Sequence, residues 1–170
     1  EDLFDIYIQP LSWGQTSWVS DFNEERQWMD TTIEKTISYI QGGGQFDISL
    51  QVTIPNEFEK MAPTNIGYTA GIETTRVAPL WLQQAELMDK IIVVSEHSKF
   101  GFDTTEIKTQ DPATGQEFIA KVNTPIDVVG YPVKDIQTRP IKLELKDDFN
   151  FLTVGTWIPR KNLENTIKWL

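Results

Sequence analysis

The chain has 170 residues, with 15 lysines and arginines against 25 aspartates and glutamates, one histidine and no cysteine. An apolar fraction of 39% and a charged fraction of 24% exclude a disordered or fibrous protein. The net charge of −10 argues against a nucleic-acid-binding surface, which needs clustered lysine and arginine. Without cysteine, and with a single histidine, the chain has no disulfide, thiolate nucleophile or multi-histidine metal centre. No stretch is apolar enough to span a membrane, so we expect a soluble, cytoplasmic α/β chain.

Both ends suggest a piece of a larger protein. The chain opens at Glu1, almost directly before a strand-like segment, and stops at Leu170 inside an amphipathic helical pattern. We therefore expect truncation at both ends.

Strand-like and helix-like spacing of apolar residues alternate along the chain. Ile91 to Val94, apolar on both faces, is typical of a central parallel strand covered by helices. The expected strands are residues 5–9, 47–53, 65–70, 91–94, 126–131 and 151–155, and the expected helices are residues 21–41, 77–89, 95–102 and 163–170. This alternation predicts an α/β fold with a doubly wound parallel sheet. Residues 1–148 would form one lobe, lacking its first strand, and residues 149–170 would begin a second.

Two local motifs interrupt the alternation. The glycine triplet 42–44 follows a helix and precedes a strand, whereas a phosphate-binding loop needs the reverse order. We interpret the triplet as a helix end. Residues 104–122 contain two alternating stretches around the turn sequence DPATG, and there we expect an inserted β-hairpin.

Two polar clusters are candidate binding sites. Arg160 and Lys161 lie at the start of the last expected helix, where they would hold an anion with the helix N–H groups or be solvated surface residues. Glu73 and Arg76 follow strand 65–70, where open α/β sheets bind ligands, and could bind a sugar or another polyol. The residues alone favour another interpretation, a helix-capping segment with Thr74 or Thr75 as N-cap and a local Glu73–Arg76 ion pair.

The remaining chemistry-bearing residues favour structural roles. We expect Ser95 to cap the helix that follows strand 91–94, and His97 to be an exposed first-turn residue. No Ser-His-acid triad can be assigned, because nothing fixes a partner for His97. Trp13, Trp18 and Trp28 could line a sugar-binding cleft, but core and rim positions are more typical of tryptophan.

The chain resembles GT-B glycosyltransferases of the glycosyltransferase 4 (group 1) type in two segments. Residues 66–99 (IGYTAGIETTRVAPLWLQQAELMDKIIVVSEHSK) resemble the family's strand, helix and "D-x-[IV]-x-V-x-S" strand. Residues 149–170 (FNFLTVGTWIPRKNLENTIKWL) resemble the "VGR-x-x-x-x-K-G" junction where the donor lobe begins.

The resemblance implies two Rossmann-like lobes that face each other across a cleft. A sugar would pass from a nucleotide-sugar, bound without metal, to a hydroxyl of a glycan, lipid or small molecule, with retention of anomeric configuration. The residues implied for donor binding are Gly155, Arg160 and Lys161, and those for acceptor binding are Glu73, Thr74, Arg76 and Ser95.

The chain departs from the family at several positions. Thr156 replaces the arginine after the glycine, Asn162 replaces the glycine after the lysine, and the loop after strand 65–70 lacks the histidine of many relatives. The paired-glutamate motif of the donor lobe is absent, so we expect these residues alone to be inactive. The alternative function is a non-catalytic glycan- or protein-binding module that uses Trp13, Trp18 and Trp81. Peripheral membrane contact, common among relatives, stays open, but no basic patch favours it.

Overall fold

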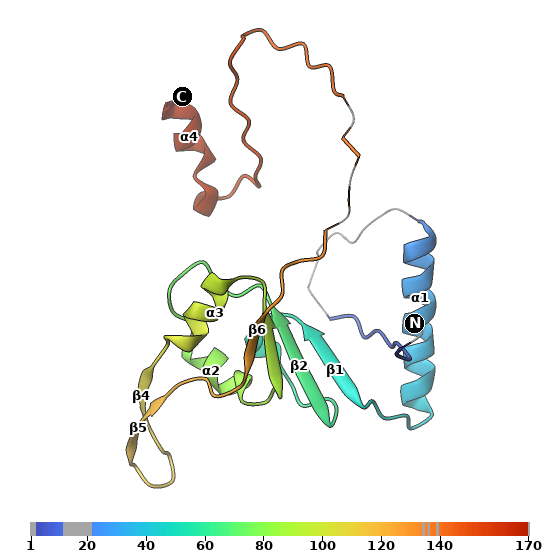
Figure 1. Cartoon of the computed structure of the whole chain (residues 1–170), viewed down its shortest axis with the longest axis vertical. Coiled ribbons are helices and arrows are strands. Elements are labelled where there is room, and N and C mark those ends of the chain that lie inside the picture. The colour runs from blue at the N-terminus through green and yellow to red at the C-terminus, as the bar shows by residue number, and fades with distance from the viewer. Residues whose placement is uncertain (1–2, 12–21, 134, 136, 139, 170) are drawn as a thin grey trace. The chain divides into compact units, whose positions relative to one another are not determined.

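The computed structural model describes residues 3–11, 22–133, 135, 137–138 and 140–169 (Figure 1). The chain divides into two compact units, Glu1–Pro132 and Val133–Leu170. The first unit contains every described strand and the hydrophobic core, whereas the described helical residues of the second form one short 3₁₀ turn and one helix.

A four-stranded parallel sheet forms the centre of the first unit. Its strands β1 (Ile48–Val52), β2 (Thr64–Thr69), β3 (Lys90–Val93) and β6 (Ile126–Val128) lie side by side in that order. The register pairs Leu50 with Ile66 and Ile92 with Asp127. The predicted α/β class with a parallel sheet is therefore confirmed.

The helices of the first unit are α1 (Glu24–Gln41), α2 (Pro79–Ala85) and α3 (Glu96–Asp103), with a 3₁₀ turn, η1 (Pro55–Glu57). Asn23 is the N-cap of α1, and its side-chain oxygen accepts a hydrogen bond from the Arg26 N–H at 2.9 Å. Gly42 and Gly43 end α1, and Gly43 has a φ of +79° that suits glycine. The interpretation of the glycine triplet as a helix end is confirmed.

The predicted hairpin is also confirmed. Strands β4 (Ile107–Gln110) and β5 (Glu117–Ala120) pair antiparallel and project from the sheet as a separate ribbon (Figure 1). At the turn, an Asp111 carboxylate oxygen accepts from the Ala113 N–H at 2.7 Å, and Gly115 has a φ of +70°.

The core covers one face of the sheet. Ile91, Val93 and Ile126 alternate toward it from β3 and β6, and α3 packs against both strands. Phe58 lies directly over β2, because a Cβ atom on Gly67 would come within 2.4 Å of its ring. The buried apolar side chains are those of Phe58, Val77, Leu82, Ala85, Met88, Ile91, Val93, Phe102 and Ile126.

The opposite face of the sheet is more open. Ile48, Leu50 and Val52 alternate toward it from β1 and are 52–59% exposed. The strands lie in the sheet in the same order as in the chain, β1, β2, β3 and β6. Right-handed connections between successive strands therefore place the connecting helices on one face of the sheet only. A doubly wound sheet also needs a reversal of strand order. The described residues contain no such reversal, and the doubly wound arrangement stays a prediction.

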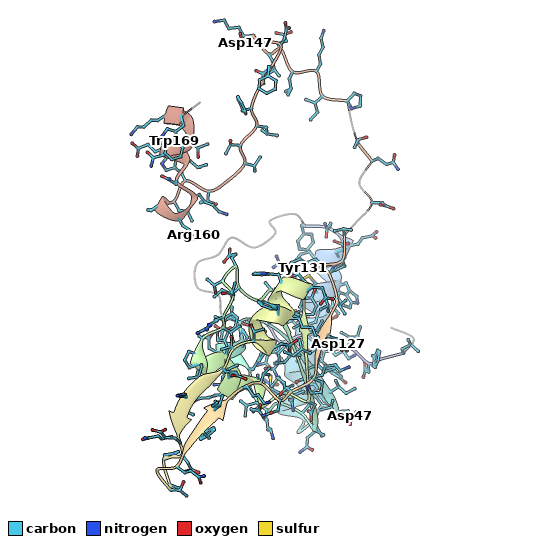
Figure 2. The ribbon with its side chains drawn as sticks, turned by 60° about the vertical axis from the view of Figure 1, so that its left-hand side comes forward. Asp47, Asp127, Tyr131, Asp147, Arg160 and Trp169 are labelled. Carbon is cyan, nitrogen blue, oxygen red and sulfur yellow. The ribbon has the colours of Figure 1, made fainter. Side chains whose placement is uncertain are left out.

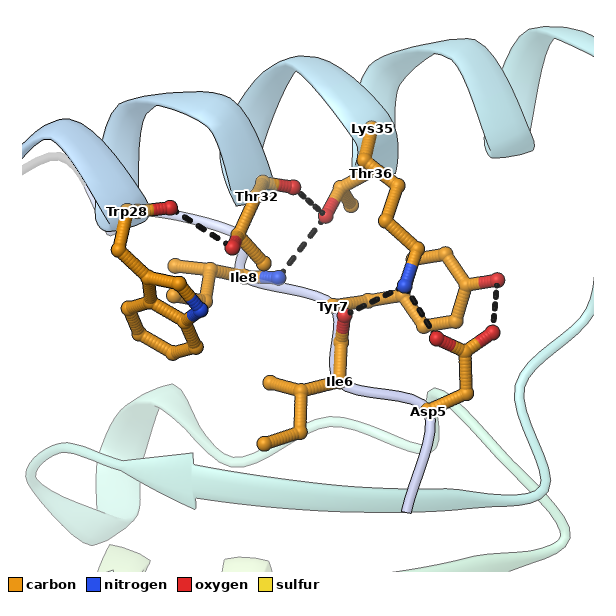
Figure 3. A network of polar contacts seen from close by, with 8 residues as sticks. All are labelled: Asp5, Ile6, Tyr7, Ile8, Trp28, Thr32, Lys35 and Thr36. Carbon is orange, nitrogen blue, oxygen red and sulfur yellow. Dashed lines mark hydrogen bonds and ion pairs between the residues drawn. The ribbon is translucent and has the colours of Figure 1, made fainter. Parts of the chain in front are cut away.

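Two expected strands are wrong. Residues 5–9 are irregular, and their backbone is held by α1, where the Thr36 hydroxyl accepts from the Ile8 N–H at 2.8 Å (Figure 3). Residues 151–155 are also irregular, with Leu152 and Val154 nearly 90% exposed. A strand needs a neighbouring strand for its hydrogen bonds, and the described part of the second unit offers none.

The helix expected at 163–170 is present as α4 (Leu163–Trp169), preceded by the 3₁₀ turn η2 (Pro159–Lys161). The helix expected at 77–89 is shorter, because α2 ends at Ala85 and turns at Leu87 and Met88 follow it. None of the helices that the structure describes is both long and apolar enough to cross a membrane.

Candidate functional site

The candidate acceptor residues come together where β2 and β3 end. Glu73, Thr74 and Arg76 lie in the loop of residues 70–77 that follows β2, and Ser95 lies between the end of β3 and the start of α3. Parallel strands end at the same edge of a sheet, which is where open α/β sheets bind ligands. Glu73, Thr74 and Arg76 are exposed, and Ser95 is half-buried.

Ser95 caps helix α3, as predicted. Its hydroxyl oxygen accepts a hydrogen bond from the Ser98 N–H at 3.1 Å and lies 3.0 Å from the Ser98 hydroxyl. The Ser98 hydroxyl also lies 2.9 Å from the Ala70 carbonyl, to which it donates. Ser95 and Ser98 therefore join the end of β3 to the start of the loop of residues 70–77.

The loop is not a helix cap, and that interpretation is wrong. Helix α2 begins after Ala78, which makes no side-chain capping bond. The Thr74 hydroxyl donates instead to the Arg76 carbonyl at 2.8 Å, so it closes a turn within the loop. The Val77 N–H, which follows, donates to the buried Thr105 hydroxyl at 3.0 Å.

His97 is an exposed residue in the first turn of α3, as predicted, and it also contacts this loop. Its Nε2 atom is 3.3 Å from the Glu73 carbonyl oxygen. The sequence offered one signal for this contact. His97 comes shortly after predicted strand 91–94, and the loop of residues 70–77 comes after predicted strand 65–70, so both follow the end of a strand. The contact between this loop and α3 was not visible in the sequence.

The candidate donor residues belong to the second unit. Arg160 and Lys161 are exposed residues of η2, which is separated from α4 by Asn162 (Figure 2). Asn162, between η2 and α4, has a φ of +51°. Among the described residues it is the one non-glycine residue with a positive φ. Gly155 has open space around it, because a Cβ atom there would meet only a Leu163 methyl group, at 4.0 Å. The predicted position of both cations at a helix start is confirmed, and anion binding stays a prediction.

A cavity of about 580 Å³ lies between residues 3–6 and α1, with Trp28, Lys35 and Asp5 in its lining. Lys35 forms an ion pair with Asp5, and its Nζ atom also donates to the Ile6 carbonyl at 3.2 Å (Figure 3). The Asp5 carboxylate accepts from the Tyr7 hydroxyl at 2.9 Å. Hydrogen bonds from Lys35 and Tyr7 lower the pKa of Asp5 below its ordinary value.

The other tryptophans give less support to a sugar cleft. Trp13 and Trp18 lie outside the described residues. Trp81 stacks on the core residue Phe102, with ring centroids 5.9 Å apart, so it is part of the core packing. Within the described ranges, no three histidine, aspartate or glutamate side chains converge as metal ligands.

Comparison with known proteins adds no relative. No protein family, curated protein or solved structure matches the chain. The resemblance to glycosyltransferases therefore rests on the residues of segments 66–99 and 149–170.

Proposed function

We propose that the chain is the acceptor-binding lobe of a GT-B glycosyltransferase with the first elements of its donor-binding lobe. The observation that carries the proposal is the convergence of the loop of residues 70–77 and Ser95 at the carboxyl edge of β2 and β3. An acceptor substrate would bind at this edge. The lobe would be a Rossmann-like, doubly wound sheet, completed by a reversal of strand order.

The backbone at Asn162 supports the donor-side part of the proposal. The resemblance places a glycine at this position, and glycine adopts positive φ most readily. Asn162 has a φ of +51°, and asparagine is among the few other residues that tolerate this conformation. The substitution thus preserves the turn that brings Arg160 and Lys161 to the start of α4.

The reaction would transfer a sugar from a nucleotide-sugar to a hydroxyl group of a glycan, lipid or small molecule, with retention and without a bound metal. Negative charge grows on the departing nucleoside diphosphate as the glycosidic bond breaks. Lys161 and Arg160 would stabilise that charge electrostatically. We place this reaction in the cytoplasm, as the composition predicts.

A glycan-binding module is the second candidate, and the cavity beside α1 favours it. Trp28 supplies an aromatic face, and Asp5 and Lys35 supply an acceptor and a donor for sugar hydroxyls. In that case the chain would bind a glycan without consuming a nucleotide-sugar.

Mass spectrometry of acceptor mixtures tests the proposal. The full-length protein is incubated with UDP-, GDP- and ADP-linked hexoses and with oligosaccharides, glycolipids and small alcohols. We expect one acceptor class to gain a single hexose. If no acceptor gains mass with any donor, while oligosaccharides still bind and Trp28→Ala abolishes that binding, the binding module is favoured and the transferase is wrong.

A further inference from the structure

The chain's single histidine contacts a backbone carbonyl through one of its two ring nitrogens. His97 is exposed in the first turn of α3, and its Nε2 atom lies 3.3 Å from the Glu73 carbonyl oxygen. A carbonyl oxygen only accepts hydrogen bonds, so Nε2 carries the hydrogen. In the neutral ring, Nδ1 then has a lone pair and acts as an acceptor.

The loop that receives this hydrogen bond is fixed at its start, middle and end by α3 and the residues beside it. At the start, the Ser98 hydroxyl donates to the Ala70 carbonyl at 2.9 Å. At the end, the Val77 N–H donates to Thr105 at 3.0 Å. The contact of His97 with Glu73 lies between these two anchors.

Gly71 allows the close approach between the loop and α3. Its φ is +75°, and a Cβ atom at this position would lie 2.5 Å from the Cβ and hydroxyl oxygen of Ser98. The loop therefore packs closely against α3, and the contact with the Glu73 carbonyl orients the imidazole toward the loop. A fixed acceptor of this kind is preorganised for a ligand that donates a hydrogen bond.

We propose that His97 orients the acceptor substrate by accepting a hydrogen bond from one of its hydroxyl groups at Nδ1. This inference rests on the proposed function and names its acceptor chemistry, a sugar hydroxyl that donates to an imidazole. The hydroxyls of Ser98 and Thr105 are used in holding the loop, which leaves the imidazole Nδ1 as an acceptor directed away from the Glu73 carbonyl.

Two substitutions distinguish the role of Nε2 from the role of Nδ1. The amide of His97→Gln reaches the position of Nε2 and can still donate to the Glu73 carbonyl. The amide of His97→Asn reaches only the position of Nδ1, where its oxygen can accept from a ligand. A purely structural role predicts that glutamine rescues function, whereas ligand orientation predicts that asparagine does.

The test is nuclear magnetic resonance of the ¹⁵N-labelled chain, in which the one histidine gives unambiguous imidazole signals. The probes are the methyl glycosides of glucose, mannose and galactose. In the neutral imidazole we expect the hydrogen on Nε2 and the lone pair on Nδ1, and a change of the Nδ1 signal as a probe is added. His97→Gln should weaken probe binding about tenfold, the effect of one lost hydrogen bond, and His97→Asn by less.

The opposite tautomer, an Nδ1 signal that none of the probes changes, or full probe binding by His97→Gln would overturn the inference. Its failure is distinguishable from failure of the proposed function. Sugar transfer that is the same in His97→Gln contradicts only the role of His97. An Nδ1 response without transfer to any acceptor contradicts the transferase and leaves a hydroxyl-binding site.

Discussion

Single residues determine the geometry of the candidate acceptor loop. Gly71 and Ser98 touch where the loop leaves β2, and the Ser98 hydroxyl connects the Ala70 carbonyl to the cap of α3. A side chain at residue 71 would be strained by the positive φ, and its Cβ atom would also clash with Ser98.

Gly71→Ala should destabilise the first unit by about 2–5 kcal/mol. Positive φ costs alanine about 1–2 kcal/mol, and overpacking against Ser98 adds about 1–3 kcal/mol. Gly115→Ala is the matched control, because Gly115 has a φ of +70° but open space around it, and only about 1–2 kcal/mol is expected. Urea unfolding measures both. Equal losses in the two variants would show that Ser98 does not restrict the loop.

At this scale, the sequence predicts local contacts and misses contacts between residues far apart in the chain. The Ser95 cap follows from a serine placed just before a helical pattern, and all its atoms lie within four residues. The contact between His97 and Glu73 joins residues 24 positions apart. It depends on how β2 and β3 are paired, which no local pattern contains.

Elements form where their hydrogen bonds can be completed. Helix α4 and the hairpin β4–β5 complete theirs internally, and both were predicted from spacing and turn chemistry. Residues 151–155 have a strand-like sequence, but strand formation there requires a neighbouring strand. The prediction failed because apolar spacing reports a preference for a strand and cannot supply the partner.

An ion pair joins the neighbouring strands β3 and β6. The Lys90 ammonium lies 2.6 Å from an Asp127 carboxylate oxygen. The hydrogen bond from Lys90, and then its charge, lower the pKa of Asp127 below its ordinary value, and the charge of Lys99 adds to this effect. A lowered carboxyl pKa contributes stability above the unfolded-state pKa, which is lost as the pH falls through the folded-state pKa.

Asp127→Asn should therefore lower the free energy of unfolding slightly at neutral pH, by the small amount typical of an exposed pair. The difference between wild type and variant should shrink as the pH falls below the ordinary range of an aspartate. Urea unfolding at stepwise lower pH measures it, with Lys90→Met as the background in which the effect should be much smaller, because only the weaker contribution of Lys99 remains. A difference that is independent of pH, or one that is equally large without Lys90, contradicts this account.

The whole molecule consists of two units of unequal character. All the buried apolar side chains of the described core lie between Phe58 and Ile126, in the first unit. In the second unit, the large apolar side chains of residues 149–158 are exposed, including those of Phe151 and Trp157. Because the first unit contains this core, we expect it to fold independently.

Residues 1–132 alone should unfold in one cooperative transition, at nearly the same urea concentration as the whole chain. A matched truncation to residues 1–123 removes β6 with the core residue Ile126, and it should unfold at markedly lower urea. Circular dichroism follows both transitions. If residues 1–132 lose the cooperative transition, the second unit contributes to the core and the division into units is wrong.

At this scale, the sequence predicted the class of the fold but not the order of its strands. Alternating strand and helix patterns indicated a parallel sheet, and the buried residues Ile91 and Val93 identified a central strand. Strand order depends on which segments pair in space. The reversal expected for a doubly wound sheet is therefore beyond what spacing of apolar residues can predict.

The central claim is that the chain takes part in sugar transfer from a nucleotide-sugar, and Lys161 tests it most directly. The measurement is release of nucleoside diphosphate by the full-length protein, comparing wild type, Lys161→Ala and Lys168→Ala. Lys168 is the control because it lies in α4 and pairs with Glu164 at 2.6 Å. We predict that Lys161→Ala lowers turnover by about 10- to 1000-fold, the scale of losing one charge-stabilising donor, and that Lys168→Ala leaves it unchanged. Equal turnover in all three proteins would contradict the donor site, and no release from any nucleotide-sugar would contradict the transferase.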